Sequence, residues 1–276
     1  MRNKNLDNIG LMTGPLLVFG GVYSNLQSLL ALQKKSLELG IPPSNIICTG
    51  DVVGYCAQPE EAVTAIREWG IHCIAGNVEL QLSDGEEDCG CNFEDGSRCA
   101  GFSKLWYPYA QTQLSPDSLA WMEALPLHVT FQYGGKQVYV LHGSVTEPAG
   151  YVFRSTTWEE KQEQFNATQA DIILAGHCGL PFHQTVNTKQ WLNPGVIGMP
   201  ANDGTPRVWY MTLNDANNPV NFEHHSYDYD HETAARLMRE KQLPDEYAST
   251  LSTGLWDNCE ILPGEETALQ GVEIEF

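Results

Sequence analysis

The stretch of residues 46–61, IICTGDVVGYCAQPEE, constrains the fold more than any other part of the sequence. Its apolar run ends at Gly50 and Asp51, and a helix is predicted to begin at Pro59, with two glutamates in its first turn. In α/β proteins, a short buried strand followed by glycine, a carboxylate, a loop and a helix places the acid at the carboxyl end of the strand. We therefore expect Asp51 to point into a crevice above a sheet. A Gly-Asp pair alone is more often an ordinary turn, so the other strand ends decide between these interpretations.

The same alternation of strand and helix extends on both sides of this stretch. The predicted elements are strands at residues 16–19, 46–48 and 71–75 and helices at residues 24–40 and 59–69. Ser24 is the predicted N-cap of the first helix, and Gly70 lies just past the end of the second. Because strands separated by helices pair in parallel through right-handed crossovers, this half of the chain predicts an α/β fold with a parallel sheet.

The pattern changes after residue 82. Residues 83–99 are acidic, rich in glycine and cysteine and without periodicity, and we expect a loop there. Further elements are predicted as a helix at 115–125, strands at 129–133, 138–141, 171–175, 190–192 and 207–213, and helices at 230–241 and 244–251. The later strands follow one another closely, which predicts a second, partly antiparallel sheet packed on the first. We divide the chain into an N-terminal tail (1–15), a core (16–213) and a C-terminal helical segment with an acidic tail (214–276).

Composition restricts the classes of partner. The chain has 35 acidic and 15 basic side chains and a formal net charge of -20. So acidic a protein gains no counterion release from polyanions, which argues against nucleic acids and anionic membranes as partners. There is no run of eighteen apolar residues to span a membrane. Eight cysteines without a recognisable secretion signal favour a reducing cytoplasm, where cysteines are core residues, metal ligands or redox groups.

Four polar side chains follow four of the predicted strands. They are Asp51, Asn77, His142 in LHGS and His177 in AGHCG. A carboxylate, an amide oxygen and two imidazoles form a mixed set suited to Zn, Mn or Fe(II). Each of these residues by itself is more often a hydrogen-bonded core residue. Because all four stand beside glycine at the end of an apolar run, we predict that they converge on a metal ion.

Several motifs carry a family resemblance. The chain resembles the small bacterial branch of the calcineurin-like metallophosphoesterases in motifs that occur in the family's order: GDVVGYCAQPEE, GNVE, LHGS, GHCGLPF and LNPGVIGMP. A segment near Tyr227, YDYDHETAARLMREKQLP, resembles a C-terminal helical segment of the family. The resemblance implies a two-sheet α/β/β/α sandwich with a C-terminal helical appendage, with its site above the strand ends. It also implies a metal-dependent hydrolase that acts on a small phosphate ester.

The sequence departs from the family at one group of positions. The family's first motif, D-x-H-G-N, here reads GVYSN at residues 21–25, so that only Asn25 matches. The histidine of GNHE is Val78, and the second histidine of GHxH is Gly179. By resemblance, these losses remove the ligands of one of two metal ions that the acid at position 51 would bridge. The ligands of the other ion, Asp51, Asn77, His142 and His177, are all present. We therefore expect a reduced site with one divalent ion (Mn, Fe or Zn) per chain.

The expected catalytic residues are Asp51, Asn77 and His142. Val78 cannot assist a leaving group, and a missing general acid costs roughly 10²- to 10⁴-fold in rate, which leaves a weak phosphatase. The alternative is a catalytically silent protein that keeps the fold and binds a ligand or partner.

Three residues are candidates for substrate binding. Tyr23 and Asn25 stand in the altered first motif, and Arg154 follows the strand that carries His142. Tyr23 would donate to a phosphate oxygen or ligate a metal, and otherwise it packs over the crevice. Arg154 would clamp an anion, and otherwise it is a surface arginine.

Cysteines offer a third possibility. Cys56, Cys89, Cys91 and Cys178 are candidate thiolate ligands that would rebuild the lost metal site or support redox chemistry. The alternative is a structural role, because the C-x-C-x₇-C spacing of Cys89, Cys91 and Cys99 is not a standard zinc pattern.

Overall fold

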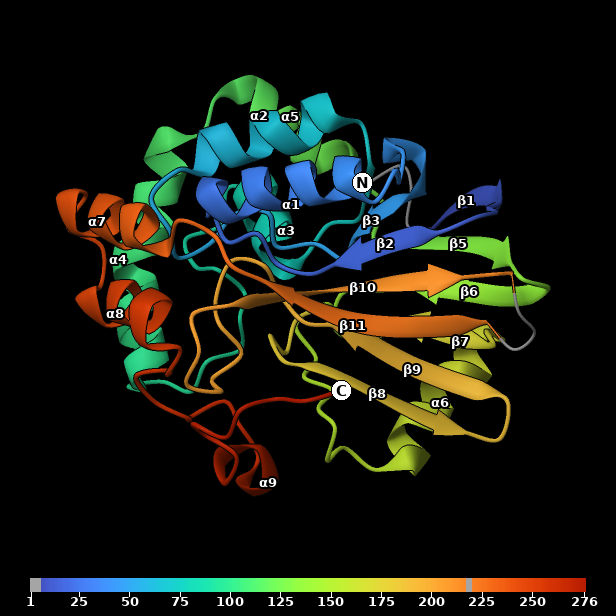
Figure 1. Ribbon diagram of the computed structural model, residues 1–276. Coiled ribbons are helices and arrows are strands. Elements are labelled where there is room, and N and C mark those ends of the chain that lie inside the picture. Colours follow the sequence, from blue (N-terminus) through green and yellow to red (C-terminus); the bar gives the residue numbers. More distant parts are fainter. Residues whose placement is uncertain (1–5, 217–219) are drawn as a thin grey trace.

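A computed structural model describes residues 6–216 and 220–276 of the chain. Two mixed β-sheets lie face to face, and helices cover their outer sides (Figure 1). The predicted α/β/β/α sandwich with C-terminal helices is therefore confirmed.

Both sheets combine strands from distant parts of the sequence. The six-stranded sheet has the order β1 (Leu6–Leu11), β5 (His128–Tyr133), β6 (Lys136–Val140), β7 (Ile172–Leu174), β9 (Lys189–Pro194) and β8 (Pro181–Val186). The five-stranded sheet has the order β11 (Asn221–Tyr227), β10 (Val208–Asn214), β2 (Leu16–Phe19), β3 (Ile46–Cys48) and β4 (His72–Cys73). The strands β2, β3 and β4 pair in parallel, as predicted, and so do β6, β7 and β9.

The helices are α1 (Leu26–Glu38), α2 (Pro59–Trp69), α3 (Asn77–Asp84), α4 (Arg98–Gln113), α5 (Pro116–Ala124), α6 (Trp158–Thr168), α7 (His231–Glu240), α8 (Asp245–Thr253) and α9 (Gly264–Thr267), with a 3₁₀ turn at Pro43–Asn45. The helices α1 and α2 lie over the five-stranded sheet, and α6 lies on the far side of the other sheet (Figure 1). The helices α4, α7 and α8 lie at one end of the sandwich (Figure 1). None of the described helices is long and apolar enough to cross a bilayer.

Strand β2 shows how the layers are held together. All four of its residues are fully buried. Leu16 and Val18 pack between the two sheets, whereas Leu17 and Phe19 pack into the core beneath the helices. This division follows from the two-residue period of a strand, which turns successive side chains to opposite faces. A strand that is apolar at every position thus belongs between two apolar layers.

Some expected boundaries are wrong. Residues 6–11 of the expected N-terminal tail form β1, which pairs in parallel with β5. Strand β10 joins β2 in the first sheet instead of the second. The N-cap of α1 is Asn25, not Ser24, because its side chain accepts from the backbone N–H of Ser28 at 3.2 Å. The elements β8, β11, α3, α4, α6 and α9 were not expected, whereas α2 was predicted to the residue and α5, α7 and α8 to within two residues.

The strand ends meet at one edge of the sandwich. Asp51 follows β3, Asn77 begins α3 just after β4, and His142 and His177 follow β6 and β7. Position 50, just before Asp51, has to be a glycine because there is no space for a side chain. A Cβ at this position would lie 2.6 Å from the backbone nitrogen of Gly76, and the backbone has φ +97°. Only glycine lets the loop after β3 approach its neighbours this closely.

Candidate metal centre and its pocket

Four predicted ligands converge on one point. The Nε2 atom of His142 lies 3.1 Å from Oδ2 of Asp51, 3.1 Å from Oδ1 of Asn77 and 3.2 Å from Nδ1 of His177. One ligand atom each from Asp51, His142 and His177 lies within 4.8 Å of the others, and all three residues are buried. Residues that are far apart in the sequence thus share one small polar site at the edge of both sheets.

The hydrogen bonds around the site fix which atoms face it. Nδ1 of His142 lies 2.6 Å from the carbonyl oxygen of Thr49, which accepts its proton and leaves Nε2 with a lone pair. Asn77 donates its Nδ2 to the carbonyl of Cys89 at 2.9 Å, so that Oδ1 faces His142. The lone pairs of a carboxylate, an amide oxygen and an imidazole are therefore directed at one another, an arrangement that requires a cation or a shared proton between them. These donors fit a divalent ion such as Mn, Fe or Zn.

Two ligand residues have unusual backbone conformations. Asp51 has φ +56° and His177 has φ +61°, in the left-handed region that non-glycine residues seldom adopt. Such conformations persist only where the surrounding structure imposes them, and they concentrate at functional sites. The backbone thus holds both ligands at positions that a relaxed chain would not choose.

The ligands also perturb one another's protonation. Burial opposes ionisation of Asp51, but the charge of His142 and their hydrogen bond hold its pKa below the usual value. Burial likewise acts against the charged form of His142, but Asp51, the carbonyl of Thr49 and the charge of Glu79 together raise the pKa of this imidazole. For His177, burial and then the neighbouring His142 lower the pKa to about 3. His177 is therefore neutral near pH 7, the form that can coordinate a metal.

A buried glutamate supports this arrangement. Glu79 is fully buried and accepts hydrogen bonds from the backbone N–H groups of Asp51 (2.8 Å), Val53 (3.1 Å) and Gly76 (2.9 Å). Burial, and then the charge of Asp51, raises its pKa to about 7. Glu79 thus ties the loop that carries Asp51 to the start of α3. Sequence reasoning missed this role, although a glutamate three residues after Gly76 is the signal of a helix capping box.

Comparisons with known proteins agree with this geometry. The sequence matches the calcineurin-like phosphoesterase superfamily domain over residues 29–216. This chain belongs to that superfamily. An uncharacterized protein of Methanocaldococcus jannaschii is 23% identical over 252 residues, which cover 86% of this chain and 97% of that protein.

Two solved structures share the fold of this calcineurin-like phosphoesterase. A hypothetical protein from Pyrococcus horikoshii OT3 has a TM-score of 0.74 at 17% identity and covers 88% of this chain and 99% of its own. A metallophosphoesterase from Sphaerobacter thermophilus has a TM-score of 0.66 at 22% identity and covers 88% of this chain and 100% of its own. At these identities the likeness concerns the fold.

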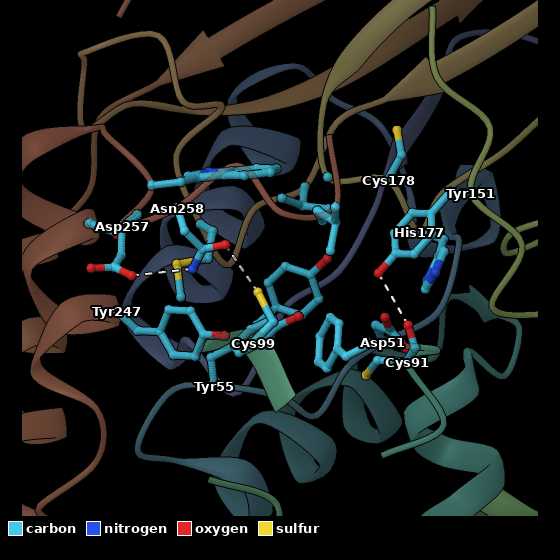
Figure 2. A pocket seen from close by; sticks show the side chains of 18 residues that line it. Asp51, Tyr55, Cys91, Cys99, Tyr151, His177, Cys178, Tyr247, Asp257 and Asn258 are labelled. Atoms are coloured by element: carbon cyan, nitrogen blue, oxygen red, sulfur yellow. Dashed lines mark hydrogen bonds between the residues drawn. The ribbon is translucent and has the colours of Figure 1, made fainter. Parts of the chain in front are cut away.

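A pocket of about 80 Å³ opens beside the four converging side chains. Asp51 and His177 lie at one end of it, and Tyr247 of α8, Asp257 and Asn258 lie at the other (Figure 2). Trp256 and Ile261 also line the pocket. The pocket is lined by six aromatic side chains: Tyr23, Tyr55, Phe93, Tyr151, Tyr247 and Trp256. The pocket thus has polar residues at both ends, with Asp51 and His177 at one and Asp257 and Asn258 at the other, and aromatic side chains among the rest of its lining.

Tyr23 lines this pocket, as a residue of the altered first motif was expected to do. Its ring lies against Gly21, where an added Cβ would be 2.6 Å from Cζ of the tyrosine. Burial, followed by the charge of Asp51, raises the pKa of Tyr23 well above its usual value, so that the phenol stays neutral. The ring therefore occupies the space that a side chain at position 21 would need.

Two of the expected substrate-binding residues lie elsewhere. Asn25 is fully buried and caps α1, and its Nδ2 donates to the carbonyl of Gly198 and to Tyr229, so its polar atoms are already used within the fold. Arg154 lines a different cavity, of about 400 Å³, next to the C-terminal residues 272–276. Neither residue lines the pocket that contains Asp51 and His177, so their roles in substrate binding stay predictions that this pocket does not support.

The described structure gives no support to the cysteines as ligands of a second metal ion. Within residues 6–216 and 220–276, no group of three potential ligands close enough for a metal includes a cysteine. Cys91 and Cys178 line the pocket, but burial raises both pKa values, that of Cys178 to about 12. Cys56 is buried and its pKa is also raised, and the carbonyl of Cys89 serves Asn77. The geometry thus supports structural roles for Cys56, Cys89, Cys91 and Cys178.

Proposed function

We propose that this calcineurin-like phosphoesterase hydrolyses a small phosphate ester with a single divalent metal ion held by Asp51, Asn77, His142 and His177. The observation that carries the proposal is the convergence of these four side chains, with their lone pairs directed at one point. The packing of Tyr23 against Gly21 supports one ion instead of two, because the ring fills the place of the lost ligands.

A bound divalent ion would supply charge neutralisation at the phosphoryl oxygens and a lowered pKa for water. The protein's own residues prepare the site for this chemistry. Thr49 fixes the tautomer of His142, the carbonyl of Cys89 orients Asn77, and Glu79 holds the loop of Asp51. Such supporting contacts typically contribute about 10- to 100-fold to metal affinity.

The leaving group would receive no proton from the residue after Asn77. Val78 is 3% exposed and carries no ionisable group, and its backbone N–H points to Oδ1 of Asp51 at 3.4 Å. The loss of a general acid costs roughly 10²- to 10⁴-fold for a poor leaving group. The enzyme would therefore favour esters whose alcohol is acidic enough to depart as an anion.

The test combines metal analysis with turnover. Protein freed of metal with a chelator and reloaded with Mn²⁺ is expected to hold one ion per chain and to hydrolyse a chromogenic p-nitrophenyl ester. In His142→Ala, metal binding and turnover are expected to fall at least about 100-fold. The control is His225→Ala on β11, which lies outside the pocket and bonds to Thr212.

Three results would count against the proposal: two ions per chain, turnover without metal, or equal turnover in His142→Ala and the control. Metal binding without turnover of any phosphate ester would favour the alternative of a catalytically silent ligand-binding protein. We also propose a reducing cytoplasm as the location, supported by eight cysteines that are all free thiols.

A further inference from the structure

The lining of the pocket has an unusual balance of charge. The described residues that line it include no lysine and no arginine. Its carboxylates are Asp51 among the metal ligands and Asp257 at the opposite end (Figure 2). Asp257 is already paired with Arg98, whose Nε and Nη2 donate to it at 2.6 and 2.8 Å. The guanidinium of Arg98 also faces Glu246 at 3.4 Å, so its charge is shared between two acids.

This balance limits the charge of a substrate, given the single ion of the proposed function. A divalent ion brings two positive charges, Asp51 removes one, and the buried carboxyl of Glu79 beside it lowers the sum further when it is ionised. At most one positive charge is therefore left for the substrate. A phosphate monoester carries about -1.5 to -2 at pH 7, whereas a diester carries a single negative charge. Because an unpaired charge in a buried site is costly, the site matches the monoanion.

The aromatic part of the pocket occupies the place of the lost metal ligands. Tyr23 stands where the first motif of the family has a histidine, and its ring covers Gly21, where the motif has an aspartate. Gly179 stands where the second histidine of GHxH is missing, and an added Cβ there would touch the ring of Trp256 at 3.4 Å. Of the three missing ligands, one is thus replaced by Tyr23 and the other two by Gly21 and Gly179. The two glycines leave space for the rings of Tyr23 and Trp256.

These rings are held in place. The indole Nε1 of Trp256 donates to the carbonyl of Pro200 at 2.8 Å, and its backbone N–H donates to Asn202 at 2.8 Å. The rings of Tyr23 and Tyr55 meet edge to face with centroids 4.7 Å apart, and Tyr55 meets Tyr247 at 4.8 Å. Fixed aromatic walls receive a planar apolar group at a low entropic cost.

We propose that the pocket is a subsite for the organic group of a phosphodiester, and that the enzyme prefers monoanionic diesters with an aromatic or other planar apolar group to dianionic monoesters. Trp256 is the specificity-determining residue. In the reaction, the oxygen of water bonds to phosphorus and the bond from phosphorus to one ester oxygen breaks. The products are a phosphate monoester and an alcohol or phenol. Of the two protons of the water, one ends on the departing ester oxygen and the other is released to solvent.

Three chromogenic esters with the same leaving group separate charge from shape. These are p-nitrophenyl phosphate, methyl p-nitrophenyl phosphate and bis(p-nitrophenyl) phosphate, assayed with the Mn²⁺-loaded protein. We expect kcat/KM to be at least tenfold higher for the methyl diester than for the monoester, and higher again for the bis-aryl diester.

Variants assign these preferences to residues. Trp256→Ala is expected to remove the advantage of the bis-aryl over the methyl diester, mainly through KM. The matched control is Leu255→Ala, since Leu255 is 40% exposed and does not line the pocket. Phe93→Lys, in the partly exposed loop before α4, adds a cation to the lining and is expected to raise monoester turnover relative to the diesters.

Binding without metal gives an independent measure of the subsite. Calorimetric titration of the metal-free protein with p-nitrophenol is expected to show binding that Trp256→Ala loses and Leu255→Ala keeps. A preference for the monoester, or equal effects of Trp256→Ala on both diesters, would overturn the inference while leaving metal-dependent hydrolysis intact. Failure to hydrolyse any of the three esters would overturn the proposed function and this inference together.

Discussion

Replacing Gly21 by alanine would test whether the ring of Tyr23 fills the place of the lost metal ligands. The new Cβ would lie 2.6 Å from Cζ of the tyrosine, a separation that real Cβ atoms essentially never show, and 3.0 Å from Cδ1. The ring is 6% exposed and is confined by Tyr55 and by the backbone around Gly198, where an added Cβ would be 2.6 Å from Cβ of Tyr23. With no room to move aside, we expect Gly21→Ala to destabilise the fold by about 1–3 kcal/mol, the usual cost of overpacking.

The destabilisation by Gly21→Ala should disappear when the ring of Tyr23 is removed. Tyr23→Ala by itself is expected to cost about 3–5 kcal/mol, as for other large aromatic side chains in cores. In that background, Gly21→Ala should change the free energy of unfolding by less than about 0.5 kcal/mol, so the two substitutions couple by about 1–3 kcal/mol. Urea unfolding of the metal-free proteins, followed by circular dichroism, measures the free energy of unfolding of the wild type, the two single variants and the double variant.

A control separates this contact from a general effect of alanine. Gly101 lies within α4, and an added Cβ there meets no heavy atom within 4 Å. Gly101→Ala should stabilise the protein by about 0.5–1 kcal/mol, since alanine favours helix, and should add independently to Tyr23→Ala. Additive effects of Gly21→Ala and Tyr23→Ala, or a wild-type stability for Gly21→Ala, would refute the argument that the ring occupies this space.

Two further predictions concern a buried lysine and the exposure of the cysteines. Burial lowers the pKa of Lys161 to about 8. The unfolded chain therefore binds more protons than the folded chain between pH 8 and 10.5. As the pH rises through that window, the free energy of unfolding of the wild type should increase by up to about 3 kcal/mol relative to that of Lys161→Met. Urea unfolding at several pH values checks this, and a pH-independent difference would contradict it. Of the eight free cysteines only Cys259 is partly exposed, so Ellman's reagent should label one thiol rapidly in the native protein and none in Cys259→Ser. Rapid labelling of several thiols in the native protein would show that the buried cysteines are accessible after all.

The sequence could predict which four side chains converge, because each of them carries a local signal. Asp51, Asn77, His142 and His177 each follow a short apolar run with a glycine beside it, and parallel strands bring their carboxyl ends to one edge. No contact between distant residues had to be known for this prediction. The fold class followed for the same reason, because alternating strands and helices leave few topologies open.

The elements that escaped prediction have weaker local signals. Strands β8 and β11 lie at sheet edges and carry mixed polar residues, so neither shows the continuous apolar run of β2 or β3. Strand β1 is mostly exposed and pairs in parallel with β5, which is far away in the sequence. What makes such segments strands is the open edge of a neighbour, which the sequence does not reveal.

The sequence by itself determined the family, the two-sheet architecture and the four polar side chains that converge at the strand ends. The tertiary structure decided that Tyr23 and Trp256 fill the space of the missing ligands, that Glu79 supports the loop of Asp51, and that Arg154 lies at a different cavity. The reason is physical: a motif fixes where the backbone places a residue, but the direction and packing of its side chain depend on segments far away in the chain. Contacts such as that between Trp256 and Gly179 exist only once those segments have come together.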